Sequence, residues 1–486
     1  MRLNDILKDI DVLEIKGNRT CDIINFHFDS RLISENDMFI AINGVTQDGN
    51  KYINSAIEKG ASVIVCEKIP QLINEKVTYV LSKNTRKALS KISCNFYGNP
   101  SKKIKLIGVT GTNGKTSVVS LLHQLFSKLG EKCGLISTVE NLIGDKKIES
   151  THTTPDPKQL NFLINKMVDE ECAYCFMEVS SHALDQERIS DLNFDIAVFT
   201  NITHDHLDYH KNFENYLNTK KGFFDNLDSK SIALVNKDDK RHEYILQNSK
   251  ANKHTFSLKS FSHYKCKIIE SDFDGMLLEI DNSQLWVKLT GRFNAYNLLA
   301  IYSVAILLEK EKIEVLNKMS LLLPAEGRFQ TFKSSNDVVF ILDYAHTDDA
   351  LQNVISTINS IRKKNQNLIT VFGCGGDRDK LKRPIMTQTA CKLSSRVILT
   401  SDNPRSENID NIISDMLSEI SKEDLARTIV INDREQAIKT AFSIAQSSDI
   451  ILVAGKGHEK YQEINGERKP FDDKEKILEL INLNIN

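Results

Sequence analysis

A regular alternation of apolar runs and helical patterns in the last third of the chain constrains the fold most. Apolar runs typical of buried strands are separated by amphipathic segments and occur at 338–344, 368–373, 396–401, 428–433 and 449–455. Strands that alternate with helices form a parallel sheet with helices on both faces. Ligands bind such sheets beyond the carboxyl ends of the strands, so the polar residues after these runs are candidates for a site.

The 486-residue chain is too long for one hydrophobic core, and we expect three α/β domains. Residues 1–100 form the first, which ends in a turn-rich and then basic segment. Residues 101–324 form a central parallel-sheet domain, in which short alternating segments at 252–290 predict a small antiparallel excursion. Residues 325–486 form a doubly wound, Rossmann-like domain. The remaining strand candidates are 38–42, 61–67, 77–82, 104–109, 175–179, 195–200 and 231–236.

Composition and charge exclude several classes of protein. The formal net charge is -2, so nothing global favours nucleic acid or an anionic lipid surface. No stretch approaches ~20 uninterrupted apolar residues, which argues against a membrane helix. The first eighteen residues carry acids among their apolar positions, unlike a signal peptide. We therefore expect a cytoplasmic, monomeric protein without a membrane or nucleic-acid partner.

The nine cysteines do not suggest a disulfide framework in a chain of this kind. Cys172 and Cys175 form a lone C-x-x-C at the start of an apolar run, with no second pair at zinc-finger spacing. Buried structural cysteines are the favoured interpretation, and a redox or zinc role is the alternative.

A glycine-rich segment after the strand candidate 104–109 predicts a phosphate-binding loop. Its residues read G-V-T-G-T-N-G-K-T-S from Gly108 and lead into an amphipathic helix. Glycines let backbone amides point at phosphate oxygens, and the helix N-terminus adds partial positive charge. Lys115 would reach the β- and γ-phosphates, and Thr116 would bind Mg²⁺. The strict phosphate-loop pattern, G-x-x-x-x-G-K, has glycine at the position of Val109, so this loop is a variant.

Acidic and histidine side chains follow the next two strand candidates. Glu178 ends one of them, and His204, His206 and His210 follow the other. Three histidines suggest zinc, but hard oxygen ligands beside a phosphate loop favour Mg²⁺.

The T-G-T-N-G-K-T segment at 110–116 resembles the ATP loop of the Mur ligase superfamily, which includes folylpolyglutamate synthetases. The resemblance spans essentially the whole chain and implies the three-domain fold of that family. It also implies the reaction: a carboxylate attacks the γ-phosphorus of ATP to form an acyl phosphate, and an amine then displaces phosphate. A dry site is needed because water would hydrolyse the acyl phosphate.

The resemblance assigns the nucleotide and metal residues. Mg²⁺ would be held by Thr116, Glu178, His206 and a lysine carbamate formed from CO₂ on Lys220, whose neighbour Lys221 leaves the register open. With Lys115 these residues form the catalytic set. ATP would contact Thr110, Gly111, Thr112, Asn113, Gly114, Lys115, Thr116, Asn294, Asn297, Arg328, Asp343 and His346.

The same resemblance assigns a UDP-muramoyl-dipeptide site. The matching positions are Ser30, Val45, Thr46, Gln47, His152, Thr153, Thr154, Ser180, Gln186 and Arg188. Arg188 is suited to clamp a carboxylate or phosphate.

The D-N-P-R segment at Asp402, Asn403, Pro404 and Arg405 resembles the signature of family members that add meso-diaminopimelate. Arg378, Gly455 and Glu459 match the other contacts to this amino acid, and Glu459 would hold the distal ammonium. A guanidinium binds the distal carboxylate bidentately, whereas lysine would leave it unpaired at a cost of roughly 1.5–3 kcal/mol.

The resemblance therefore implies an ATP-dependent ligase that adds meso-diaminopimelate to UDP-N-acetylmuramoyl-L-alanyl-D-glutamate in peptidoglycan precursor synthesis. The alternatives are the same reaction with L-lysine, a folylpolyglutamate-type ligase, and a phosphate-loop nucleotide switch without ligase chemistry.

Overall fold

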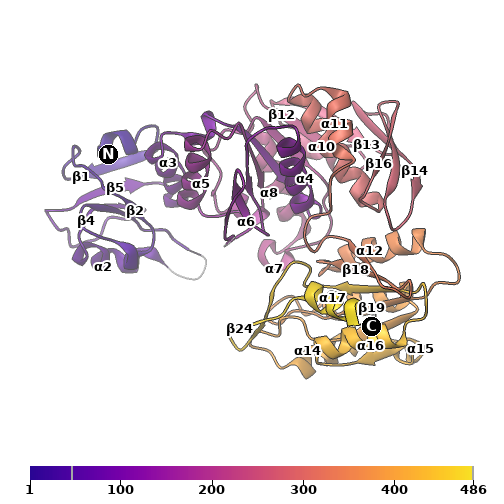
Figure 1. Cartoon of the computed structure of the whole chain (residues 1–486). Coiled ribbons are helices and arrows are strands. Elements are labelled where there is room, and N and C mark those ends of the chain that lie inside the picture. Colours follow the sequence, from indigo (N-terminus) through magenta and orange to yellow (C-terminus); the bar gives the residue numbers. More distant parts are fainter. Residues whose placement is uncertain (45–47, 151, 484–486) are drawn as a thin grey trace.

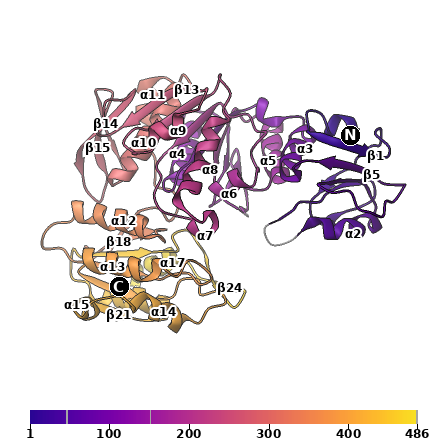
Figure 2. The ribbon, with the colours of Figure 1, turned by 180° about the vertical axis from the view of Figure 1, so that it is seen from behind.

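Three helix-flanked sheets follow one another along the chain in the computed structural model, which describes residues 1–44, 48–150 and 152–483. In Figure 1 the N-terminal part lies at one end of the central part, and the C-terminal part lies against another side of it. The view from behind shows the same arrangement (Figure 2), with helices α3 and α5 side by side at the junction of the first two parts.

The N-terminal part is a five-stranded sheet in the order β1-β5-β4-β3-β2, parallel except for the edge strand β1. Apolar side chains alternate between its faces, so that Val63 and Val65 join one core while Ile64 and Cys66 join the other. Its elements are β1 (Val12–Lys16), β2 (Phe26–His27), β3 (Asp37–Ile40), β4 (Ala61–Cys66), β5 (Thr78–Ser82), α1 (Leu3–Ile6), α2 (Ile53–Glu58) and α3 (Thr85–Phe96).

The central part is an eleven-stranded sheet in the order β16-β15-β14-β13-β12-β11-β6-β10-β7-β8-β9. Large cores lie on both of its faces. Its strands are β6 (Lys105–Thr110), β7 (Cys133–Ile136), β8 (Asn141–Ile143), β9 (Lys146–Ile148), β10 (Tyr174–Glu178), β11 (Ile196–Phe199), β12 (Ile232–Asn236), β13 (Asn252–Ser257), β14 (Tyr264–Ser271), β15 (Met276–Ile280) and β16 (Ser283–Val287). Its helices are α4 (Lys115–Lys128), α5 (Pro157–Asp169), α6 (Ser181–Asp185), α7 (Leu207–His210), α8 (Phe213–Asp225), α9 (His242–Leu246), α10 (Arg292–Leu307) and α11 (Lys312–Met319).

The predicted antiparallel excursion is present but begins later than its pattern indicated. Strand β13 pairs parallel with β12 and with β14. Within this excursion the antiparallel pairing begins at β14, because β14 and β16 each pair antiparallel with β15. Three further strands at the other edge, β7 to β9, carried no clear signal because two of them are only three residues long.

The C-terminal part is a six-stranded sheet in the order β17-β18-β22-β19-β20-β21, parallel except for the edge strand β17. All five predicted strands are present, and cores on both faces confirm the doubly wound arrangement. The strands of this sheet are β17 (Gln330–Lys333), β18 (Val339–Asp343), β19 (Leu368–Phe372), β20 (Arg396–Leu399), β21 (Thr428–Val430) and β22 (Ile450–Ala454), while β23 (Tyr461–Ile464) and β24 (Glu467–Pro470) form a separate two-stranded antiparallel sheet. Its helices are α12 (Asp348–Ile361), α13 (Lys382–Leu393), α14 (Ile409–Leu417), α15 (Lys422–Leu425), α16 (Arg434–Ile444) and α17 (Asp473–Leu483).

All nine cysteines are free thiols. Cys172 and Cys175 are buried in one core of the central sheet, which confirms the structural interpretation of this pair. Within the described ranges no helix is both long and apolar enough to cross a bilayer.

Candidate active site

Two glycines shape the predicted phosphate loop between strand β6 and helix α4. Gly111 and Gly114 have φ angles of +156° and +89°, which favour glycine. A Cβ atom at Gly111 would lie 1.9 Å from Thr200 Oγ1, and one at Gly114 would lie 2.8 Å from Asn297 Oδ1. The loop can therefore make this close turn only where both positions lack a side chain.

Lys115 folds back over the loop. Its Nζ donates hydrogen bonds of 2.8 Å to Gly111 O and to Thr112 O. Burial lowers the pKa of Lys115, and the negative charges of Glu178 and Asp205 oppose that shift. The ammonium thus lies at the N-terminus of helix α4, where a phosphate group is stabilised by backbone amides.

Glu178 and Thr116 meet the requirements of a divalent-cation site. Glu178 ends strand β10, next to β6 in the sheet, and is fully buried. Its Oε1 accepts a hydrogen bond of 2.8 Å from Thr138 N, while Oε2 is buried without a hydrogen-bond partner among the described residues. A buried carboxylate oxygen left open beside a phosphate loop fits Mg²⁺, which prefers oxygen ligands.

The three histidines do not converge on a common point. His206 has a φ of +54°, its Nε2 lies 3.4 Å from Asp205 Oδ2, and burial lowers its pKa to about 4. His210 is buried against Tyr216, whereas His204 is exposed and packs on Phe213. Among the residues that the structure describes, no group of three or more histidine, cysteine or acidic side chains is arranged to hold a metal ion.

Lys220 and Lys221 have different environments. Lys220 is 1% exposed, and its Nζ lies 3.0 Å from Gly111 O and 3.3 Å from Thr110 Oγ1, directly under the phosphate loop. Burial, with the nearby charge of Lys115, holds the pKa of Lys220 well below its usual value. Lys221 instead pairs with Asp225 at 2.6 Å. Of the two, only Lys220 points toward the loop.

The predicted nucleotide residues lie around the loop from both sides. Asn297 Nδ2 donates to Asn294 Oδ1 at 3.2 Å, so both asparagines lie behind Gly114. Arg328, from the C-terminal part, donates from Nη2 to Thr116 Oγ1 at 3.3 Å and lies over the ring of Tyr344.

Asp343 and His346 follow strand β18. Asp343 accepts backbone hydrogen bonds from Phe329 N and Ala345 N, both 2.8 Å, and burial raises its pKa to about 6. Its carboxylate therefore holds the turn that carries Arg328. The ring of His346 packs against Tyr344. Burial lowers the pKa of His346, and the charge of Asp205 in the central part opposes that shift, so the ring faces the junction of the two parts.

Four of the residues predicted to bind the muramoyl peptide form one hydrogen-bonded cluster. Arg188 donates to Thr154 O at 2.6 Å and to Gln186 Oε1 at 2.7 Å, and Ser180 N donates to Thr154 Oγ1 at 3.1 Å. Thr154 Oγ1 in turn donates to Glu178 O at 2.8 Å. The cluster therefore adjoins the candidate metal ligand.

The other residues predicted to bind the muramoyl peptide lie outside this hydrogen-bonded cluster. Thr153 Oγ1 accepts from Thr138 Oγ1 at 3.0 Å, and His152 is exposed. Ser30 is buried in the N-terminal part. Val45, Thr46 and Gln47 lie outside the described residues.

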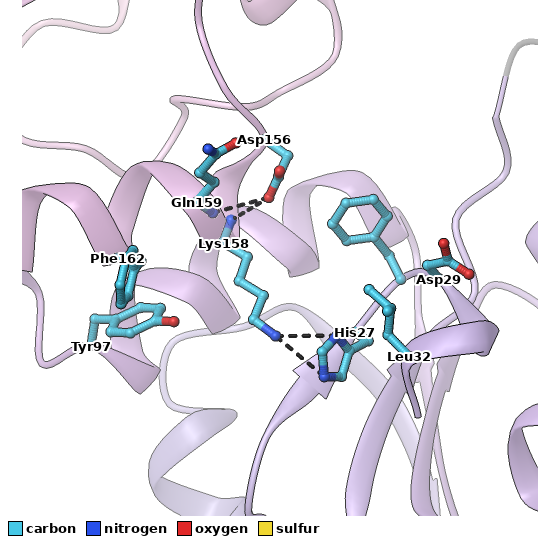
Figure 3. Close-up of a pocket in the computed structure, with 9 residues that line it drawn as sticks. His27, Asp29, Leu32, Tyr97, Asp156, Lys158, Gln159 and Phe162 are labelled. Carbon is cyan, nitrogen blue, oxygen red and sulfur yellow. Dashed lines mark hydrogen bonds between the residues drawn. The ribbon is translucent and has the colours of Figure 1, made fainter. Parts of the chain in front are cut away.

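A cavity of about 470 Å³ lies where the N-terminal part meets helix α5 (Figure 3). Lys158 projects across it and donates to Phe26 O at 2.6 Å, with its Nζ 3.2 Å from His27 Nδ1. The residues that line it combine aromatic rings with charges: His27, Phe28, Asp29, Leu32, Tyr97, Asp156, Lys158, Gln159 and Phe162.

Arg405 is held between two loops of the C-terminal part. Its backbone has a φ of +53°, its N–H donates to Glu463 O at 3.0 Å, and its Nη1 donates to Gly376 O at 2.7 Å. A Cβ at Gly376 would lie 1.9 Å from Pro404 O, so the two loops touch through a glycine. Arg378, two residues after Gly376 in the chain, is exposed.

Asn403 and Glu459 are bound to each other beside this loop. Asn403 Nδ2 donates to Glu459 Oε2 at 2.7 Å, and a Cβ at Gly455 would lie 3.0 Å from Asp402 Oδ2. Asp402 Oδ1 is buried and accepts no hydrogen bond within the described part of the chain. Burial raises the pKa of Glu459, and the charge of Asp402 adds to that effect.

A continuous set of contacts connects this region with the phosphate loop. Thr116 accepts from Arg328, the Arg328 guanidinium lies 4.6 Å from the centre of the Tyr344 ring, and Tyr344 OH lies 3.5 Å from Glu459 Oε1. The segment after strand β22, which carries Glu459, is therefore connected to the helix start after strand β6, which carries Thr116.

Sequence reasoning missed two residues of this site. Asp349 accepts a hydrogen bond from Asn113 of the phosphate loop, and Lys456 is buried among Asp402, Asn403 and Glu459. Lys456 lies inside the A-G-K-G-H-E segment that supplied Gly455 and Glu459, so a lysine beside a strand end was an available signal. Nothing in the sequence paired Asp349 with Asn113.

Three protein families match successive parts of the chain. They are described as "Mur ligase family, catalytic domain" for residues 23–97, "Mur ligase middle domain" for 109–305 and "Mur ligase, glutamate ligase domain" for 327–457.

Two curated relatives carry the name UDP-N-acetylmuramoyl-L-alanyl-D-glutamate--2,6-diaminopimelate ligase. The one from Phocaeicola vulgatus is 50% identical over 480 residues and covers 99% of both chains. The one from Clostridioides difficile is 39% identical and covers 98% of both.

A solved structure with the same name has 30% sequence identity and a TM-score of 0.71, and covers 100% of this chain and 99% of its own. A folylpolyglutamate synthase from Mycobacterium tuberculosis, complexed with ADP and AMPPCP, has 16% identity and a TM-score of 0.62 over 77% of this chain and 92% of its own. That second likeness concerns the fold alone.

Proposed function

The chain belongs to the Mur ligase family, and from this premise we propose that it is an ATP-dependent ligase that adds meso-diaminopimelate to UDP-N-acetylmuramoyl-L-alanyl-D-glutamate. Half of its residues are identical to a full-length relative named for that reaction. The observation that carries the proposal for this chain is Arg405, held beside Asn403 and Glu459 and connected through Tyr344 and Arg328 to the phosphate loop.

The phosphate loop supplies the first half of the reaction. A carboxylate oxygen of the dipeptide attacks the γ-phosphorus of ATP, the bond to ADP breaks, and an acyl phosphate forms. Lys115 and the amides at the start of helix α4 offset the negative charge of the phosphates. The amine of the incoming amino acid then attacks the acyl carbon, phosphate leaves, and the amine loses a proton.

The C-terminal part protects this intermediate. Arg328 and Asp349 both contact the phosphate loop from that side, which covers the loop against water. Exclusion of water is necessary because hydrolysis of the acyl phosphate would consume ATP without forming the amide.

Thr116, Glu178 and His206 are the residues we assign to Mg²⁺, which when bound would neutralise charge on the transferring phosphate. The open Glu178 Oε2 supports this assignment. We assign the carbamate to Lys220, since its lowered pKa leaves a neutral amine that can attack CO₂. That addition releases a proton and turns the neutral amine into an anionic oxygen ligand.

We place the muramoyl-peptide end of the UDP substrate at Thr154, Ser180, Gln186 and Arg188, because this cluster adjoins Glu178. The cavity beside Lys158 offers aromatic surface and a cation at the junction of the first two parts, which suits a nucleotide. The proposed domains are residues 1–100 for UDP, 101–324 for ATP and 325–486 for the amino acid. A reaction that consumes ATP and a UDP-linked precursor belongs in the cytoplasm.

Isotope transfer tests the proposal directly. The purified chain is incubated with ATP, meso-diaminopimelate and UDP-muramoyl-dipeptide whose carboxylates carry ¹⁸O. We expect UDP-muramoyl-tripeptide and ADP by mass spectrometry, with one ¹⁸O atom in the released phosphate. Tripeptide formed with AMP as the other product, or phosphate without ¹⁸O, would contradict the acyl-phosphate route.

A further inference from the structure

A fully buried lysine lies at the centre of the amino-acid region. Lys456 follows strand β22 and is 0% exposed. Its Nζ lies 3.1 Å from Asn403 Oδ1, 3.4 Å from Glu459 Oε2 and 3.7 Å from Asp402 Oδ1. Buried lysines are rare without a compensating partner, so this side chain needs an explanation.

The charges around Lys456 do not balance. One ammonium faces two carboxylates, and Asp402, although only 7% exposed, has a carboxylate oxygen with no hydrogen-bond partner among the described residues. Arg434, the other cation behind Asp402, is bound to Asp473 by hydrogen bonds of 2.7 and 2.8 Å and contributes little further charge. The cluster therefore retains a negative charge that a substrate ammonium can meet.

We propose that Lys456 is a positioning residue for the diamino acid: from between Asp402, Asn403 and Glu459 its ammonium holds the two carboxylates in place, so that together they bind a substrate ammonium. The inference rests on the proposed function, because it takes the diamino acid as the ligand. Lys456 also donates to Asn403, whose Nδ2 then points at Glu459.

The electrostatic surroundings give the direction of the effect. Burial raises the pKa of Glu459, the charge of Asp402 raises it further, and Lys456 and Asn403 lower it. Removal of the lysine charge would therefore raise the pKa of Glu459 further and favour its protonated form, which cannot accept a charge-assisted bond from an ammonium. The titratable or charged groups that face the two carboxyls are Lys456, Arg434 with Asp473, Tyr344, Tyr461 and Cys374.

The test compares Lys456→Met with Lys460→Met. Lys460 is four residues away, its side chain is 62% exposed, and it pairs with Glu326 at 3.4 Å, so it controls for loss of a lysine in the same segment. We expect Lys456→Met to raise KM for meso-diaminopimelate by about 10- to 100-fold near neutral pH, the loss expected for a charge-assisted contact. KM for ATP and for the UDP-dipeptide should remain that of wild type.

Two further readouts separate this role from a structural one. The KM ratio of Lys456→Met to wild type should fall as the pH rises, because the Glu459 carboxyl, whose pKa is raised by burial, ionises again without the lysine. The ratio should also stay near one for 2-aminopimelate, which has the distal carboxylate but no distal ammonium. An equal loss for both amino acids, or a ratio independent of pH, would overturn the proposal.

If Lys456→Met does not fold, Lys456→Gln takes its place, since glutamine can still donate to Asn403 without a charge. Lys456→Arg should keep most of the affinity. Wild-type enzyme that forms no tripeptide with meso-diaminopimelate would refute the proposed function, whereas active wild type with an unaffected Lys456→Met would refute only this inference.

Discussion

Asp349 Oδ2 accepts a hydrogen bond of 2.7 Å from the side-chain amide of Asn113, and this contact joins helix α12 to the phosphate loop across 236 positions of the chain. The same oxygen accepts from Thr203 Oγ1 at 3.1 Å, in the segment after strand β11. Two residues of the central part therefore converge on one carboxylate of the C-terminal part. The contact therefore joins the predicted phosphate loop directly to the C-terminal part, and we propose that it assists closure over the nucleotide.

We expect Asp349→Ala to lower kcat by about 10- to 100-fold, because a charge-assisted contact worth roughly 1.5–3 kcal/mol no longer favours the closed arrangement. Steady-state kinetics with all three substrates measure this effect. Asp348→Ala is the matched control, since Asp348 accepts a hydrogen bond from Thr389 within the C-terminal part. Equal kinetics for the two variants would show that the Asn113 contact does not assist closure.

Lys220→Ala should abolish turnover while the protein remains folded, because the Mg²⁺ site loses its proposed carbamate ligand. Circular dichroism and thermal unfolding test the fold, and added short carboxylic acids should restore part of the activity by replacing the missing oxygen ligand. Lys221→Ala, which removes the pair with Asp225 and the contact with the Tyr244 ring, should stay active. The assignment fails if Lys220→Ala is active or Lys221→Ala is not.

Local patterns predicted much of the fold, including the turn between a strand and a helix at the predicted phosphate loop. The strands and the turn at 110–116 depend on residues that are close together in the chain, so they can be predicted from the sequence. Helix α8 also shows a local pattern: Tyr216, Leu217, Lys220, Phe223 and Phe224 repeat at helical spacing, which predicts that Lys220 faces the core. Lys221 is buried as well, but through its pair with Asp225, so burial alone does not separate the two.

Other features depend on distant parts of the chain and could not be predicted from local patterns. Asp349 and Asn113 meet only after two sheets have formed and packed together. The parallel pairing of β13 depends on its neighbour β12 and not on its own alternating pattern. The place of Lys456 after a strand is visible in the sequence, but its burial beside Asp402 and Glu459 depends on how the strands pack.

Glu407 supports the loop that carries Arg405 and gives a pH-dependent prediction. It binds the buried Arg383 at 2.8 and 3.0 Å and accepts from Asp377 N at 2.6 Å, and these contacts, with Arg383 first, lower the pKa of Glu407 to about 2. A carboxyl whose pKa is lowered in the folded state stabilises the fold at pH values above its unfolded-state pKa of about 4.5. That stabilisation is lost as the pH falls through about 2.

Glu407→Gln should therefore lower the free energy of unfolding by about 1–3 kcal/mol at neutral pH, since Arg383 loses a charged partner. The difference from wild type should shrink as the pH falls below about 4.5. Urea unfolding at several pH values measures it, with the exposed Glu467→Gln as control. A difference that does not change with pH would contradict the role of this ion pair.

Lys158 gives a prediction for the cavity between the first two parts. Lys158→Ala should raise KM for UDP-muramoyl-dipeptide several-fold and leave KM for ATP unchanged, because the variant loses a cation and the bond to Phe26 O at the junction. Lys166→Ala, an exposed position on the same helix α5, is the control. If KM for the UDP substrate is unaffected, the cavity does not bind its nucleotide end.

Arg405→Ala should raise KM for meso-diaminopimelate by about 10- to 100-fold, because the variant lacks the guanidinium that we propose binds the distal carboxylate. L-Lysine, which lacks that carboxylate, should be used equally poorly by Arg405→Ala and by wild type. Kinetics with the two amino acids measure this, and an unchanged KM for meso-diaminopimelate would reject the assignment of Arg405.

The most direct test of the central claim is the rate at which the wild-type chain releases phosphate from ATP in the presence of UDP-muramoyl-dipeptide and one amino acid at a time. The account predicts rapid release with meso-diaminopimelate and little release with L-lysine or with no amino acid. Release at the same rate whichever amino acid is present, or faster release with lysine, would contradict it.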